Sequence, residues 1–127
     1  MTFLRSHLMP VLAIAGIADR VSIERGDITA MPFPPSAFDS AVSAHAMDHL
    51  GPGKQQGLDE VYRVLKPGGR FLMVVWVPGW TTFAMANVLS FFLTSKEHWR
   101  RMARQSGFAI EDEGLMNGMW WALLRKG

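Results

Sequence analysis

The sequence predicts an α/β fold in which helices pack on both faces of a mostly parallel sheet. Segments typical of strands and of helices follow one another in the order strand, helix, strand, helix, strand. The run from Phe71 to Val77 is continuously apolar and rich in β-branched and aromatic residues. Such a run is typical of a strand that is covered on both faces.

The length and composition predict one domain with a hydrophobic core, and we treat residues 1–127 as a single domain. The chain has no cysteine, which excludes a disulfide scaffold, a thiolate metal site and a cysteine nucleophile, and fits a reducing cytoplasm. The formal net charge is only +2 and the arginines cluster loosely, so we expect no nucleic-acid partner.

No segment has the roughly 18 to 20 consecutive apolar residues that a membrane span needs. The nearest candidate, Phe83 to Leu93, is short and is interrupted by Asn87 and Ser90. The apolar stretch from Leu8 to Ile17 lacks a convincing signal-peptide cleavage site. We therefore expect a cytoplasmic protein with no membrane partner.

The first part of the chain predicts a helix and two short strands. Apolar residues at helical spacing predict an amphipathic helix over residues 2–15, with a kink at Pro10. The alternation from Val21 to Arg25 predicts a strand that ends at Gly26. A loop with three prolines follows, and Phe38 to Ala44 is predicted as the next strand.

The second part predicts two helices and three strands. Leu58, Val61, Tyr62 and Leu65 share one helix face, and Lys66-Pro67-Gly68-Gly69 ends that helix. The remaining expected elements, after the strand at Phe71, are a helix from Lys96 to Gln105 capped by Ser95 and ended by Gly107, and strands at Phe108 to Glu111 and Met119 to Leu124.

Ligands of open α/β sheets bind beyond the carboxyl ends of the strands. This rule selects the loop Gly26-Asp27-Ile28, the segment Ser43-Ala44-His45 and the turn after Val77. The carboxylate of Asp27 could accept a hydrogen bond from a ligand, or it could form an Asx turn that satisfies its own loop. The residues alone leave both interpretations open.

His45 and His49 lie four positions apart and would share a face if this stretch were helical. A zinc-protease pattern requires a glutamate where Ala46 stands, and no third ligand has a helpful spacing, so we expect no metal. A general base, or a histidine that hydrogen-bonds at the rim of the site, fits these residues better.

Several segments are similar to one known family. Leu58 to Arg70, with its Leu-Lys-Pro-Gly-Gly turn, is the most specific of them. The others are Ala15 to Val21, Arg25 to Phe33, Phe38 to Ser43, Met47 to Leu50 and Ser106 to Phe108. In this order and spacing they resemble the small-molecule, type 11-like class I S-adenosylmethionine-dependent methyltransferases. The resemblance covers nearly the whole chain and implies a Rossmann-like three-layer sandwich.

The resemblance also implies a cofactor, S-adenosylmethionine, and residues that bind it. Asp27 would accept a hydrogen bond from the adenine amino group, and Ile28 would touch the adenine ring. Ser43 and Ala44 would line the methionine end of the cofactor.

On the same grounds, His45 and His49 would face the methyl acceptor, with His49 the better candidate for a general base. Methyl transfer from a sulfonium is an in-line displacement, so the protein mainly supplies alignment and dehydration. A base is needed only when the acceptor must lose a proton.

The sequence departs from the family because the glycine-rich loop and the ribose-binding acidic residue have no counterpart before Met1. The family's strand order, 3-2-1-4-5-7-6, then leaves a gap between the strands at Val21 and Phe38. Either these strands pair directly, or the gap is filled by another chain, such as a second copy in a homodimer, or the chain is a fragment. We expect a methyltransferase domain that is incomplete relative to the family and binds its cofactor weakly or not at all. The alternative is a non-catalytic binding or structural protein.

Overall fold

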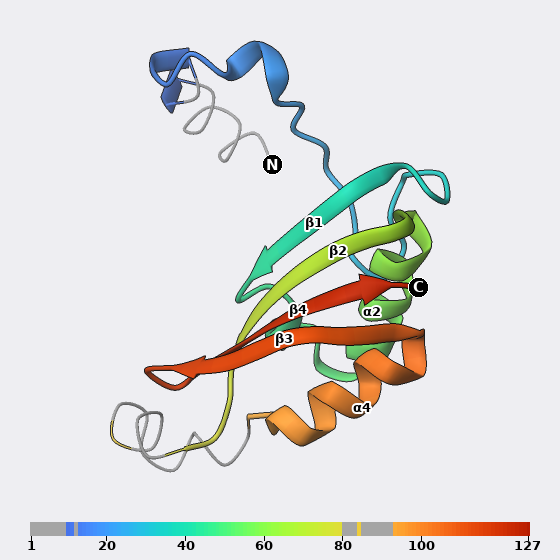
Figure 1. The fold of residues 1–127 in the computed structure, drawn as a ribbon. Helices are drawn as coiled ribbons and strands as arrows, with labels where there is room; N and C mark the ends of the chain where they lie inside the picture. The colour runs from blue at the N-terminus through green and yellow to red at the C-terminus, as the bar shows by residue number, and fades with distance from the viewer. Residues whose placement is uncertain (1–9, 12, 80–83, 85–92) are drawn as a thin grey trace.

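The computed structural model describes residues 10, 11, 13–79, 84 and 93–127 (Figure 1). Its four strands are β1 (Phe38–Ala44), β2 (Leu65–Trp76), β3 (Phe108–Met116) and β4 (Met119–Lys126). They form one sheet in the order β1-β2-β4-β3. The β1–β2 pair is parallel, whereas β2–β4 and β3–β4 are antiparallel. The α/β class is confirmed, and the sheet is mixed rather than mostly parallel.

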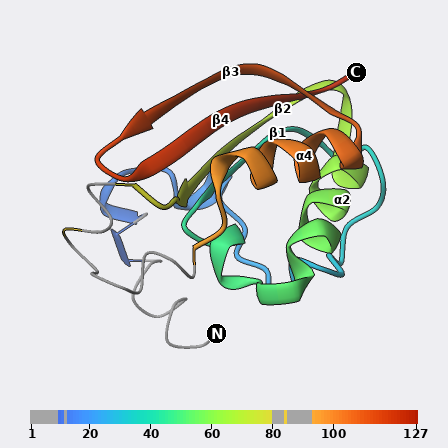
Figure 2. The same ribbon diagram turned by 90° about the horizontal axis from the view of Figure 1, so that it is seen from below.

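Helices α2 (Lys54–Val64) and α4 (Lys96–Ser106) lie together on one face of the sheet (Figure 2). The strand residues that point toward them alternate along β2 and β4 and are at most 1% exposed: Phe71, Met73, Val75, Trp120, Ala122 and Leu124. With Leu58 of α2 and Trp99 of α4 they form the hydrophobic core. In Figure 2 no described helix covers the opposite face of β3 and β4.

Helix α4 begins and ends close to where the sequence predicts. Ser95 Oγ accepts a hydrogen bond from the backbone N–H of His98 at 3.3 Å, which confirms the predicted cap. Gly107 ends the helix with a φ of 109°. A Cβ at this position would lie 2.9 Å from the Tyr62 ring, so a side chain would clash as well as strain the backbone.

Strand β2 begins earlier than predicted, at Leu65 rather than Phe71. Its register with β1 jumps from the pair Phe38–Leu65 to the pair Ser40–Arg70. The intervening Pro-Gly-Gly segment therefore forms an irregularity in the strand, with Gly68 at a φ of 80°. The helix before it ends at Val64, so Leu65, which was predicted on the helix face, is the first residue of β2 instead.

Val21 to Arg25 is not a strand, so that prediction is wrong. Direct pairing of this segment with β1 is also wrong, because the described residues pair β1 only with β2. Alternating residues form a strand only beside a partner with free backbone groups, and after the 3₁₀ turn Ala18–Arg20 the described residues offer this segment no partner strand. One edge of β1 thus has no strand beside it among the described residues.

Most of the helix predicted over residues 2–15 lies outside the described residues. Pro10, Val11, Ala13 and Ile14 are helical, and Ile14 is 88% exposed. The apolar segment from Phe83 to Leu93 lies outside the described residues except for its residues 84 and 93. In the part of the chain that the structure describes, no helix is long and apolar enough to cross a membrane.

Candidate functional site

The carboxyl ends of β1 and β2 lie next to each other, where a ligand of an open α/β sheet is expected. Ala44 is paired with Val74, and the N–H of His45 donates to the carbonyl oxygen of Val74 at 2.8 Å. His45 has a φ of 61°, in the left-handed region that few residues other than glycine adopt. The backbone therefore turns sharply at His45, directly beyond β1.

The loop after His45 is fastened to the end of β2 by Asp48. Oδ2 of Asp48 accepts a hydrogen bond from the backbone N–H of Trp76 at 3.1 Å. The Asp48 side chain is only 7% exposed. Met47, which is 1% exposed, anchors the same loop in the core. The loop is therefore held at two consecutive residues.

The imidazole of His45 lies against Trp76 and near Asp48. Its ring stacks on the Trp76 ring with 5.0 Å between centroids and 23° between planes. Its Nδ1 lies 3.9 Å from Asp48 Oδ2, which is longer than a hydrogen bond. The side chain is 33% exposed, so the ring is supported on one side and reachable by a ligand on another.

Three buried polar atoms in this region have no hydrogen-bond partner within the described structure: Ser43 Oγ, His45 Nδ1 and Asp48 Oδ1. Buried polar atoms in folded proteins are nearly always hydrogen-bonded to protein, water or ligand. Ser43 and His45 belong to the predicted site, whereas Asp48 was not assigned a role. The cluster therefore offers both donors and acceptors to a polar molecule at the strand ends.

His49 is exposed and ends the 3₁₀ turn Met47–His49. The helix face that it would have shared with His45 does not form, because His45 precedes this turn in a left-handed conformation. Over the described residues, no group of three His, Cys, Asp or Glu side chains gathers in a way that could hold a metal ion.

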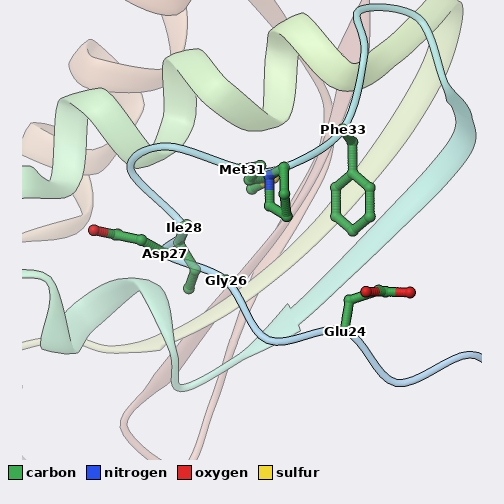
Figure 3. A pocket seen from close by; sticks show the side chains of 7 residues that line it. Glu24, Gly26, Asp27, Ile28, Met31 and Phe33 are labelled. Carbon is green, nitrogen blue, oxygen red and sulfur yellow. The ribbon is translucent and has the colours of Figure 1, made fainter.

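The second part of the site is the loop of residues 24–33, which lines a shallow, open cavity of about 240 Å³ (Figure 3). Asp27 Oδ1 accepts hydrogen bonds from the backbone N–H and the hydroxyl of Thr29, at 2.9 and 2.7 Å. These bonds hold the pKa of the Asp27 carboxyl below its usual value. The Asx turn is thus present. It uses one carboxylate oxygen, and in Figure 3 the carboxylate points away from Phe33.

Glu60 and Arg63 of α2 fasten this loop to the body of the domain. Glu60 Oε2 accepts a hydrogen bond from the N–H of Met31 at 3.0 Å. Arg63 donates to the carbonyl oxygens of Phe33 and Met31 at 2.9 and 3.2 Å, and to Glu60 at 2.7 Å. Its guanidinium holds the pKa of Glu60 below the usual value. Both residues lie in Leu58 to Arg70, the most specific segment of the resemblance, which by itself did not predict this role.

The two loops meet over Gly57 of α2. A Cβ at Gly57 would lie 2.6 Å from Leu50 Cδ1, in the loop after β1, and 3.4 Å from Ile28 Cγ2, in the loop after Gly26. A side chain at this position would therefore require the Leu50 side chain to shift. Ile28 therefore lies at the base of its loop, packed against the core.

The fold thus brings Ser43, Ala44 and His45 together at the end of β1, and places Asp27 and Ile28 on the neighbouring loop. Sequence reasoning missed the roles of Asp48 and Trp76. The only local signals were the position of Asp48 between two histidines and the position of Trp76 near the end of an apolar strand.

Comparison with known proteins gives one matching family, described as a methyltransferase domain, over residues 9–73, which is just over half of the chain. A sterol 24-C-methyltransferase of Pneumocystis carinii is 40% identical over 62 residues, covering 49% of this chain and 16% of that protein. The chain spans less than a quarter of the length of the curated relatives that it matches.

Solved structures share the fold at low sequence identity. The structure titled [4+2]-cyclase SpnF has a TM-score of 0.71 at 19% identity, covering 92% of this chain and 60% of its own. The structure titled PigF with SAH has a TM-score of 0.69 at 18% identity, covering 98% of this chain and 40% of its own. These similarities confirm the Rossmann-like fold class.

Proposed function

The chain belongs to the family of methyltransferase domains, and on that premise we propose that it takes part in S-adenosylmethionine-dependent methyl transfer to a small-molecule acceptor. The observation that carries this proposal is the cluster of unpartnered buried polar atoms, Ser43 Oγ, His45 Nδ1 and Asp48 Oδ1, at the carboxyl end of β1. The relative named a sterol methyltransferase supports a small-molecule acceptor.

The residues that we propose for the cofactor fit its chemistry. Ser43 and Ala44 would line the methionine end, where the unpartnered hydroxyl of Ser43 can donate or accept. The second carboxylate oxygen of Asp27 would accept from the adenine amino group, and Ile28 would contact the ring. When bound, S-adenosylmethionine supplies a methyl group on a positively charged sulfur.

The chain itself supplies alignment. Glu60 and Arg63 hold the Asp27 loop, and Asp48 holds the loop after β1 to the end of β2. Both loops also rest on α2 at Gly57, through the side chains of Leu50 and Ile28. Holding reactants in register is the main contribution that a protein makes to an in-line displacement.

We propose that a histidine accepts the proton that an acceptor loses. The family resemblance favours His49 for this role. The surroundings favour His45, because its ring is stacked on Trp76 while His49 is exposed. The variants His45→Gln and His49→Gln identify the base. The base is the histidine whose replacement abolishes turnover while cofactor binding is retained.

A methyltransferase of this family also needs a glycine-rich loop, which residues 1–127 do not contain. We propose that residues 1–127 form one partial domain, completed by a further segment or by another chain at the edge of β1 that has no partner strand among the described residues. Val42 on β1 is 73% exposed, and Phe38 at the start of β1 packs edge-on against Phe33 of the cavity loop. A strand added here would continue the sheet.

We also propose that the protein is located in the cytoplasm, which the lack of cysteines supports.

The alternative is a non-catalytic binding or structural protein derived from a methyltransferase that no longer binds the cofactor. One observation favours it: one carboxylate oxygen of Asp27 is engaged within its own loop. A radiolabel experiment separates the two functions. The chain is incubated with millimolar [methyl-³H]S-adenosylmethionine and a library of sterols, phenols and amines, and small-molecule products are counted.

Methyl transfer predicts label in at least one acceptor, abolished by His45→Gln or His49→Gln. The absence of both cofactor binding and label supports the alternative. Cofactor binding without label in any acceptor would contradict methyl transfer.

A further inference from the structure

Three side chains form a row across the sheet at the end where His45 lies. Trp76 of β2 is paired with Met119 of β4, and Met119 is paired with Met116 of β3. Directly paired residues point to the same face of a sheet. The adjacent row, Val75, Trp120 and Leu115, points to the other face, where Val75 and Trp120 are buried under the helices. The row Trp76–Met119–Met116, here called the apolar row, therefore faces away from α2 and α4.

The apolar row is accessible and held in place. Met116 is 55% exposed, and Trp76 and Met119 are partly exposed. The turn that joins β3 to β4 is fastened to the end of β2, because Val77 N–H donates to the carbonyl oxygen of Gly118 at 3.0 Å. Neighbouring strands lie about 4.8 Å apart, so the row extends over about 10 Å.

The apolar row begins at the candidate site. Its first member, Trp76, stacks directly on the ring of His45. The next row inward is also apolar: Trp121 pairs with Val74 and lies against Gly114, where a Cβ would be 2.7 Å from the indole. Arg70, the charged residue of β2 on this face, is at the opposite end of the strand and is paired with Glu111.

We propose that the methyl acceptor carries an apolar body that lies along Trp76, Met119 and Met116, with its reacting group beside His45. This inference rests on the proposed function and adds the chemical class of the acceptor. A small polar acceptor would leave the row in water, whereas an apolar body of about 10 Å removes all three side chains from water. Methionine suits this task because its flexible thioether adapts to irregular apolar shapes.

The test uses 4-alkylphenols with chains from ethyl to octyl, whose binding to the full chain is measured by equilibrium dialysis below their aggregation limits. Each added methylene is expected to lower the Kd roughly threefold to fourfold until the chain outgrows the row. Met116→Lys is expected to raise the Kd of 4-octylphenol about tenfold. The matched control is Leu115→Lys, since Leu115 is 57% exposed but points to the opposite face. It is expected to change the Kd less than twofold.

Kd values that do not depend on alkyl length, or equal losses in Met116→Lys and Leu115→Lys, would overturn the inference. Binding to phosphatidylcholine vesicles without binding of dissolved alkylphenols would overturn it too. Unfolding temperatures of both variants show that each is folded, and Met116→Ser repeats the test if the lysine variant is not. The failure of the proposed function gives a different result: S-adenosylmethionine does not bind, but the Kd of the alkylphenols still depends on alkyl length and on Met116→Lys.

Discussion

Met31 donates its backbone N–H to the carboxylate of Glu60, which lies 29 positions further along the chain. This bond, with those of Arg63, joins the loop of Asp27 to α2. The loop has little regular structure of its own, apart from the Asp27–Ala30 bridge. Its position therefore depends on α2.

Replacing Glu60 by alanine should loosen this loop. The N–H of Met31 loses its acceptor and Arg63 loses its ion pair, so amide exchange at Met31 should accelerate roughly tenfold. Hydrogen exchange followed by NMR measures this rate. Glu97→Ala is the matched control, because Glu97 is 60% exposed and its nearest contact with Arg100 is 3.6 Å. Unchanged exchange at Met31 in Glu60→Ala would contradict the assigned role.

The ion pair of Glu113 and Arg100 should make stability depend on pH in acid. Hydrogen bonds from Arg100 hold the pKa of Glu113 below its ordinary 4.5. Because the pKa of Glu113 is lower in the folded state, the ion pair stabilises the fold at pH values above 4.5. This stabilisation disappears as the pH falls through the lowered pKa. Urea unfolding at pH 7 should therefore give a larger free energy of unfolding for the wild type than for Glu113→Gln. This difference should shrink below pH 4.5. A difference that grows in acid would contradict this.

Calorimetric titration of the purified 127-residue chain with S-adenosylmethionine should show binding weaker than micromolar. The reason is that this chain offers mainly adenine contacts and the strand-end cluster, without a glycine-rich loop for the methionine and ribose. Micromolar affinity of the monomer alone would contradict this prediction. S-Adenosylhomocysteine, titrated in parallel, shows whether the methyl group itself affects binding.

Light scattering across a dilution series should show self-association. An edge strand with exposed apolar residues invites pairing, and Val42 is 73% exposed on β1. Val42→Lys should shift the mass toward the monomer. Ile14→Lys, at an 88% exposed residue of the N-terminal helical segment, should not. If Ile14→Lys instead shifts the mass toward the monomer, the two copies exchange the N-terminal segment. A wild type that is monomeric at all concentrations would refute self-association.

Helix α4 shows which parts of the fold the sequence could predict. Its cap at Ser95, its buried Trp99, Met102 and Ala103, and its stop at Gly107 are local signals within one segment. Val21 to Arg25 shows what could not be predicted, because alternation describes a strand only if a partner strand is present. The same segment would need a neighbour that the described residues do not provide.

The candidate site also contains residues that the sequence could predict and contacts that it could not. Ser43, Ala44, His45, Asp27 and Ile28 follow predicted strand ends, and a general rule for α/β sheets places them near a ligand. The contact of Asp48 with Trp76 joins residues 28 positions apart through a backbone N–H. No local pattern encodes it, since it depends on the path of the loop relative to β2. The roles proposed for the histidines remain predictions.

One NMR titration tests the central proposal most directly, because it detects weak binding and locates it. The ¹⁵N-labelled chain is titrated with S-adenosylmethionine up to millimolar concentration, and amide shifts are followed by residue. The account predicts saturable shifts at Asp27, Ile28, Ser43 and Ala44, with none at Arg125 on the remote end of β4. Saturable shifts confined to other residues, or no shifts at millimolar cofactor, would contradict it.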